Sequence, residues 1–172
     1  MKIFNKQGFT LVELLIVIAL LGALAIGLIG ALDPFEQLKK GTDTGVRNSV
    51  SEVQSAVVRY YALKGRMPWY DVNDTAFTGG SPSAMSLNNA SAGSILAEIV
   101  STGELKSNFS TLQASQLGKI ILTGDSQNVI VCFSPESKSF RADNNTKFGM
   151  DGGTPTGTCP NPSSSTCFWC VQ

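Results

Sequence analysis

Four cysteines are the side chains best suited to covalent or metal chemistry: Cys132, Cys159, Cys167 and Cys170. The chain has no histidine, which excludes a Ser-His-Asp triad and zinc sites with imidazole ligands. An even number of cysteines in a loop-rich C-terminal segment is typical of disulfides formed in an oxidising compartment. We therefore expect structural disulfides, and the sequence leaves all three possible pairings open.

Cys167 and Cys170 also have the CxxC spacing of redox motifs. A reactive thiol usually needs a helix N-terminus or a cationic neighbour that lowers its pKa, and neither is evident beside this pair. A zinc site of four thiolates usually contains two such pairs, and the chain has one. A membrane-tethered thiol oxidoreductase or a metal site is therefore the less favoured alternative to static disulfides.

A single carboxylate, Glu13, lies inside an apolar run from Phe9 to Leu32. An unpaired carboxylate in a membrane helix costs about 3 kcal/mol, so Glu13 predicts a cationic partner. A cut between Gly8 and Phe9 would create one, because the new α-amino group of Phe9 would lie four residues before Glu13. This ammonium group could meet the carboxylate on its own chain or on a neighbouring helix in a staggered array.

The element that carries Glu13 is long enough to cross a membrane. As a helix, residues 9–32 would extend about 36 Å, compared with about 30 Å for the hydrocarbon layer. Lys2 and Lys6 precede the run, so the short N-terminus should stay in the cytoplasm and the remainder should be exported. The run is too long for an ordinary secretory signal. An uncut signal anchor that presents a binding head is the simpler alternative.

The residues Gly8-Phe9-Thr10-Leu11-Val12-Glu13-Leu14-Leu15 resemble the class III signal of type IV pilins and pseudopilins. The resemblance implies that residues 1–8 are a leader, that prepilin peptidase cuts after Gly8, and that Phe9 becomes the N-methylated terminus. It also implies that Glu13 supports assembly by pairing with the Phe9 amine of a neighbouring subunit. Methylation keeps the positive charge of the amine, so the pair would survive it.

The resemblance also implies partners and a location. The partners are membrane lipid before assembly, the prepilin peptidase and methyltransferase, an inner-membrane assembly platform, and other copies of the chain in a helical filament. The precursor would cross the cytoplasmic membrane once, and the filament would be extracellular or periplasmic. Basic and acidic residues number 13 each, so net charge gives no support for nucleic-acid binding. A structural pilus subunit without catalysis is expected, with a type II secretion or competence pseudopilin as the alternative.

The helical pattern continues to residue 64, beyond the membrane segment. Pro34 is expected to interrupt the helix, and Asp43 with Arg47 predicts an ion pair between residues four apart. Gly65 and Pro68 predict the helix end, in a run, YYALKGRMPW, that resembles the helix-to-loop junction of pilins. One apolar stripe with helical spacing predicts the surface on which a head domain packs. The stripe consists of Val46, Val50, Val53, Val57 and Tyr60.

Residues 65–172 are expected to form the exported head. Composition predicts a turn-rich loop and then a short amphipathic helix, followed by an antiparallel meander that packs on the stripe. Cys132 would tether the irregular tail after the last strand. The fold class is thus α+β and pilin-like, with a long N-terminal helix, a small sheet and a disulfide-bearing C-terminal region. The expected elements are a loop at 67–89, a helix at 94–101, and strands at 119–123, 128–133 and 138–142.

The tail contains one further candidate site, residues 146–157, with the sequence TKFGMDGGTPTG. It faintly resembles the glycine-rich calcium loop of major pseudopilins. Calcium takes six to eight oxygen ligands, and Asp143 and Asp151 are the only carboxylates nearby. A plain surface loop is therefore favoured, and no cofactor is expected.

Overall fold

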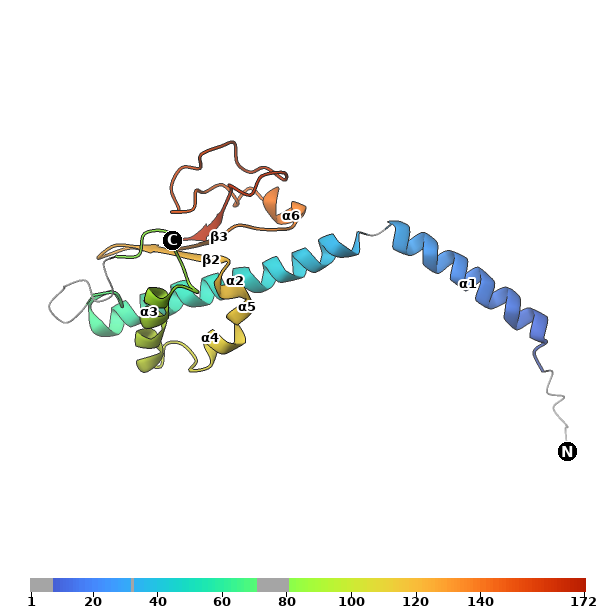
Figure 1. Cartoon of the computed structure of the whole chain (residues 1–172), viewed down its shortest axis with the longest axis horizontal. Helices are drawn as coiled ribbons and strands as arrows, with labels where there is room; N and C mark the ends of the chain where they lie inside the picture. The colour runs from blue at the N-terminus through green and yellow to red at the C-terminus, as the bar shows by residue number, and fades with distance from the viewer. Residues whose placement is uncertain (1–7, 32, 71–80) are drawn as a thin grey trace, which may run out of the picture. The chain divides into compact units, whose positions relative to one another are not determined.

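The computed structural model describes residues 8–31, 33–70 and 81–172, which form an α+β fold (Figure 1). The chain divides into two compact units, residues 1–37 and 38–172. Leu32, residues 1–7 and residues 71–80, which include part of the expected loop at 67–89, lie outside the described residues. The helices are α1 (Leu11–Ala31), α2 (Pro34–Lys64), α3 (Ala90–Ser101), α4 (Phe109–Leu112), α5 (Ala114–Leu117) and α6 (Lys138–Arg141), and the strands are β1 (Met85–Ser86), β2 (Ile120–Gly124), β3 (Val129–Phe133) and β4 (Trp169–Val171).

The first helix, α1, has no buried residue. Its side chains are aliphatic on every face apart from Glu13 and three glycines, and a helix that is apolar all round needs lipid or other protein around it. Its length and composition suffice to cross a membrane. The expected apolar N-terminal helix is therefore confirmed at residues 11–31, within the predicted 9–32.

Pro34 starts a helix in the structure, whereas the sequence predicted an interruption within one. Asp33 is not helical, and Pro34 is the first residue of α2. A residue before proline is disfavoured in helical geometry, and proline at the first helical position loses no hydrogen bond. Asp33 also caps α2, because its Oδ1 accepts a hydrogen bond from the Glu36 amide at 3.3 Å. The proposed helix of residues 9–64 is thus two helices.

The apolar stripe of α2 is the centre of the head. Its five predicted members are all completely or almost completely buried, so the predicted packing face is confirmed. The helix ends at Lys64, and Gly65 follows with a φ of 69°. The Gly65 amide donates to the Tyr61 carbonyl at 2.8 Å, as expected for a glycine cap.

The sheet is antiparallel throughout, with the order β1-β2-β3-β4. Strands β2 and β3 pair over their whole length, from Ile120 opposite Phe133 to Gly124 opposite Val129. Figure 1 shows these strands running alongside α2. One continuous core joins the α2 stripe to side chains from α3, β2, β3 and the connecting segments. These side chains include Trp69, Leu87, Ile95, Ile99, Ile120, Leu122, Val131 and Phe133.

Two predicted elements need correction. Residues 138–142 were predicted to be a strand, but Lys138–Arg141 is the short helix α6. Ser137 caps it, since its Oγ accepts from the Phe140 amide at 3.4 Å. The helix predicted at 94–101 begins earlier, at Ala90, because Asn89 caps it through the Ser91 amide at 3.1 Å.

The strand that pairs with the outer side of β3 comes from the C-terminal tail. Strand β4 pairs with β3 so that Cys170 lies opposite Cys132, and a disulfide joins the two. A second disulfide, between Cys159 and Cys167, closes a loop within the tail. The expected disulfide-bearing C-terminal region, with Cys132 as its tether, is therefore confirmed. The two cysteines of the CxxC sequence belong to different disulfides.

Candidate processing and assembly site

The candidate site is the segment at the N-terminal end of α1. It contains Gly8, Phe9 and Glu13, the three residues predicted to take part in processing and assembly. Gly8, Phe9 and Thr10 precede the helix and are exposed, and the Phe9 side chain is 86% exposed. The peptide bond between Gly8 and Phe9 therefore lies in a non-helical segment that an enzyme can approach. A backbone outside regular helix is the form in which proteases usually bind a substrate.

Thr10 and Glu13 form a reciprocal cap at the start of α1. Glu13 Oε2 accepts hydrogen bonds from the Thr10 amide and from Thr10 Oγ1, both at 2.8 Å. In return, Thr10 Oγ1 accepts from the Glu13 amide at 3.2 Å. This arrangement is a capping box, in which two otherwise unpaired amides at a helix start are satisfied. Such a cap stabilises a helix by about 1 kcal/mol.

The capping box gives Glu13 a role within its own chain that the sequence analysis missed. The pattern Thr-x-x-Glu directly before an apolar run is a readable signal for it. The cap uses Oε2, and Oε1 has no hydrogen-bond partner among the described residues. The cap therefore leaves one carboxylate oxygen available to a cation. It also holds the Glu13 carboxylate next to Thr10, the residue that follows Phe9.

Chemically, this site presents a peptide bond for cleavage and a carboxylate that hydrogen bonds hold in place. Cleavage after Gly8 would convert the Phe9 amide nitrogen into an ammonium group. The partial positive charge at the start of α1 also favours a carboxylate in its first turn. The segment therefore suits modification by other proteins and pairing with a cation.

The two carboxylates of the candidate calcium loop are occupied in local turns. Asp143 Oδ1 accepts from the Asn145 amide at 2.8 Å, and Asp151 Oδ1 accepts from the Gly153 amide at 3.0 Å. No group of three or more metal-ligating side chains occurs in the described ranges. This arrangement matches a surface loop stabilised by Asx turns.

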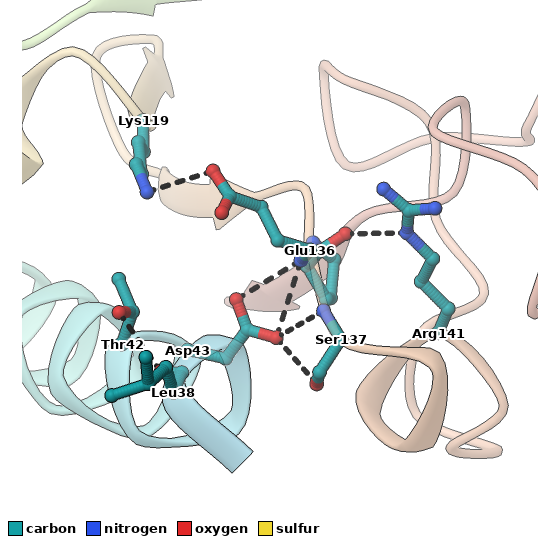
Figure 2. A network of polar contacts seen from close by, with 8 residues as sticks. Leu38, Thr42, Asp43, Lys119, Glu136, Ser137 and Arg141 are labelled. Carbon is teal, nitrogen blue, oxygen red and sulfur yellow. Dashed lines mark hydrogen bonds and ion pairs between the residues drawn. The ribbon is translucent and has the colours of Figure 1, made fainter. Parts of the chain in front are cut away.

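Asp43 contacts the head domain and not its predicted partner, Arg47. Figure 2 shows its carboxylate facing the turn that contains Glu136 and Ser137, from which it accepts four hydrogen bonds. The guanidinium group of Arg47 instead lies 4.6 Å from the ring centroid of Trp169 in β4. The predicted pair within the helix was therefore wrong, because partners distant in the sequence compete for both charges.

Residues 3–29 match the family described as the prokaryotic N-terminal methylation motif. The chain thus carries the class III prepilin signal that type IV pilins and pseudopilins share. The matched residues include Gly8, Phe9, Thr10 and Glu13, and they extend through most of α1. Comparison with curated proteins and with solved structures gave no significant match.

Proposed function

We propose that this chain is a structural subunit of a type IV pilus-like filament, made as a membrane precursor and assembled through α1. One observation carries the proposal: the methylation motif at residues 3–29 coincides with a helix that buries none of its aliphatic surface. A helix of that kind is stable in lipid and among other apolar helices, but not in water. The motif supports processing at its start.

In this proposal, residues 1–8 are a leader, residues 9–64 carry the membrane and assembly segment and the stalk of the head, and residues 65–172 are the exported head. Prepilin peptidase cuts after Gly8, and Phe9 becomes the methylated terminus. The two disulfides support export, because disulfides persist in oxidising compartments. The role is structural, and the processing chemistry belongs to the modifying enzymes.

Transfer of α1 from lipid to a bundle of sister helices needs a driving force other than the hydrophobic effect. Lipid tails are as apolar as leucine side chains, so close packing and polar contacts must favour the bundle. Gly22, Gly27 and Gly30 have open space where a side chain would start, and small residues let helix backbones approach closely. Packing of the aliphatic side chains supplies the remaining attraction.

A charge pair between Phe9 of one subunit and Glu13 of the next would fix the register of the neighbouring α1 helices. Cleavage creates an ammonium group at Phe9, and methylation keeps its charge. In a staggered bundle, this group on one subunit would bind the available Glu13 oxygen on the next. A pair of opposite charges is favourable in a dry interior only when the geometry and hydrogen bonds are good. The capping box, which fixes the carboxylate, supplies part of that geometry.

The subunit composition of surface filaments tests the proposal. Surface filaments sheared from the host should consist mainly of this chain, with its N-terminus at Phe9. Mass spectrometry of the sheared and the membrane fractions measures this distribution. Recovery of the chain solely from the membrane fraction, in a host that displays filaments of another subunit, would contradict a major structural role.

A further inference from the structure

Asp43 is a buried carboxylate on α2 that the proposed assembly chemistry does not use. Its side chain is 2% exposed, and it is the first buried residue from the N-terminal end of α2. Residues 37–41 are all exposed, and Leu38 is 69% exposed despite its aliphatic side chain. Beyond Asp43, buried positions recur with helical spacing to Tyr60. Asp43 therefore marks the point at which α2 enters the head.

The groups that donate hydrogen bonds to Asp43 among the described residues lie in the turn between β3 and α6. The Glu136 amide donates to both carboxylate oxygens, at 3.0 and 3.2 Å. The Ser137 amide and Oγ donate to Oδ2 at 2.8 and 2.6 Å. Hydrogen bonds to an ionised acceptor are about twice as strong as neutral ones. The contact thus ties α2 to the head through a charged group that is shielded from water.

The turn that receives Asp43 is itself held in place, as Figure 2 shows. Arg141 Nε donates to the Pro135 carbonyl at 2.7 Å, and Lys119 Nζ lies 2.7 Å from Glu136 Oε1. The first contact joins the turn to α6, and the second joins it to the residue before β2. The donors that face Asp43 are therefore held by contacts with parts of the head other than α2.

The helix around Asp43 has little stability of its own. Gly41 and Gly45 each lie two residues from Asp43, about half a helical turn away. A glycine inside a helix lowers the stability of that helix by about 1 kcal/mol relative to alanine. Thr42 and Thr44 turn their hydroxyl groups back to the carbonyls of Leu38 and Lys40, at 3.1 and 2.8 Å. Such bonds slightly destabilise helices. Helical geometry here depends on tertiary contacts, of which Asp43 makes the first.

We propose that Asp43 is a latch that stops local unfolding of α2 from spreading into the head. In this account, residues 38–42 open and close as a short exposed segment, and the helix from Asp43 onward opens only with the head itself. Without the carboxylate, opening would extend to the first fully buried valines, Val46 and Val50.

Amide hydrogen exchange on the full chain in detergent micelles tests the latch directly. In the wild-type protein, amides at 39–42 should exchange quickly and those at 46–50 slowly. In Asp43→Ala, exchange at 44–49 should accelerate by about tenfold or more, as expected when a buried charged contact is removed. Ser137→Ala, which removes one donor of the four, should produce a smaller acceleration of the same amides. Glu52→Ala removes an exposed carboxylate from the same helix and is the matched control.

Amides of β2 and β3 separate local opening from global unfolding. The latch predicts that Asp43→Ala leaves exchange at 120–124 and 129–133 within a factor of about two of the wild-type rate. Equal acceleration of the strands and of residues 44–49 would show a general loss of stability and would overturn the proposal. Exchange at 44–49 that matches the Glu52→Ala control would overturn it as well. The measurement does not depend on filament formation, so the proposed function can fail without affecting it.

Discussion

At the residue scale, substitutions can separate the helix cap that Glu13 forms in the structure from its proposed role in assembly. Its carboxylate caps α1 through Thr10, and in the proposed filament it also binds the Phe9 ammonium of a neighbouring subunit. Glutamine at this position keeps the acceptor that a capping box needs and removes the charge. Alanine at position 10 removes the hydroxyl of the cap and keeps the carboxylate. The two variants therefore test the helix cap and the proposed charge pair separately.

We predict that Glu13→Gln lowers the amount of subunit in sheared filaments at least about tenfold, because an ammonium group then lacks its partner in a dry interior. Thr10→Ala should cost about 1 kcal/mol of helix stability and reduce the filament yield much less. Immunoblots of sheared and membrane fractions measure both effects, and equal membrane levels show that insertion is intact. A wild-type amount of Glu13→Gln subunit in the sheared filaments would contradict the proposed charge pair.

Tyr60 is a buried tyrosine whose hydroxyl group donates to Glu98 Oε1 at 2.7 Å. Burial, followed by the hydrogen bond and the negative charge of Glu98, raises the Tyr60 pKa to about 12, while Arg66 opposes the shift. A raised pKa means that the folded chain favours the neutral phenol. This contribution to stability is complete below pH 10 and is lost as the pH rises from about 10 to 12.

An alkaline titration tests whether the pKa of Tyr60 is raised. The ultraviolet absorbance of the full chain in micelles should show one of its three tyrosines ionising near pH 12. Tyr60→Phe should remove that late component and leave the remaining transitions unchanged. Loss of a component near pH 10 in this variant would show that Tyr60 has an ordinary pKa and would contradict the assignment.

The hydrogen bonds of Asp43 show which kinds of contact can be predicted from the sequence and which cannot. Arg47 is the opposite charge four residues further along the helix, and this spacing led to a wrong prediction. The actual donors are backbone and hydroxyl groups 93 and 94 residues later in the chain. A backbone amide has no sequence signature, so this contact follows only from the tertiary fold. The Thr10–Glu13 cap, in contrast, involves residues three apart and can be read directly.

At the scale of elements, the α2 stripe carries the head, and two valines on this helix provide a matched test. Val53 is 1% exposed and Val58 is 46% exposed. We predict that Val53→Ala lowers the free energy of unfolding by about 2 kcal/mol, because it leaves a cavity between α2 and the core. Val58→Ala should lower it by about 0.5 kcal/mol or less.

Urea unfolding of the full chain in micelles, followed by tryptophan fluorescence, measures this difference. Trp69 and Trp169 both lie in the head core and report its unfolding. Equal losses for the two variants would mean that the stripe is not the packing face. Since both substitutions remove the same atoms from one helix, a difference in helix propensity cannot produce the expected contrast.

The elements that the sequence predicted well are those whose signals are local. The α2 stripe repeats with helical spacing over several turns, and β2 and β3 are apolar runs separated by a turn. The strands β1 and β4 are two and three residues long, too short for a periodic pattern. The disulfide between Cys132 and Cys170 joins β4 to β3. The sequence left this pairing open, so it could not assign β4 to the sheet.

The error at residues 138–142 has a different cause. This segment of five residues follows a turn, and its place after two predicted strands favoured a third strand. Ser137 caps a helical turn there, and its hydroxyl group also donates to Asp43. A cap combined with a tertiary contact outweighs a pattern of five residues, because so short a pattern carries little preference.

At the scale of the whole molecule, the chain combines a unit that needs an apolar environment with a head that folds around its own core. The residues of α1 are all exposed, whereas the head buries the α2 stripe together with the aromatic side chains of Trp69, Phe109, Phe133 and Trp169. In the proposed cycle, lipid surrounds α1 first and sister helices surround it later, while the head stays folded. In this cycle, cleavage after Gly8 would create the cationic partner of Glu13, which would fix the register of the packed sister helices.

The intact mass of the protein from its native host tests this claim most directly. The account predicts a chain that lacks residues 1–8, begins at Phe9, contains both disulfides and has gained one methyl group. A chain that retains Met1 to Gly8 and has no added methyl group, recovered from cells that have a functional prepilin peptidase, would contradict it.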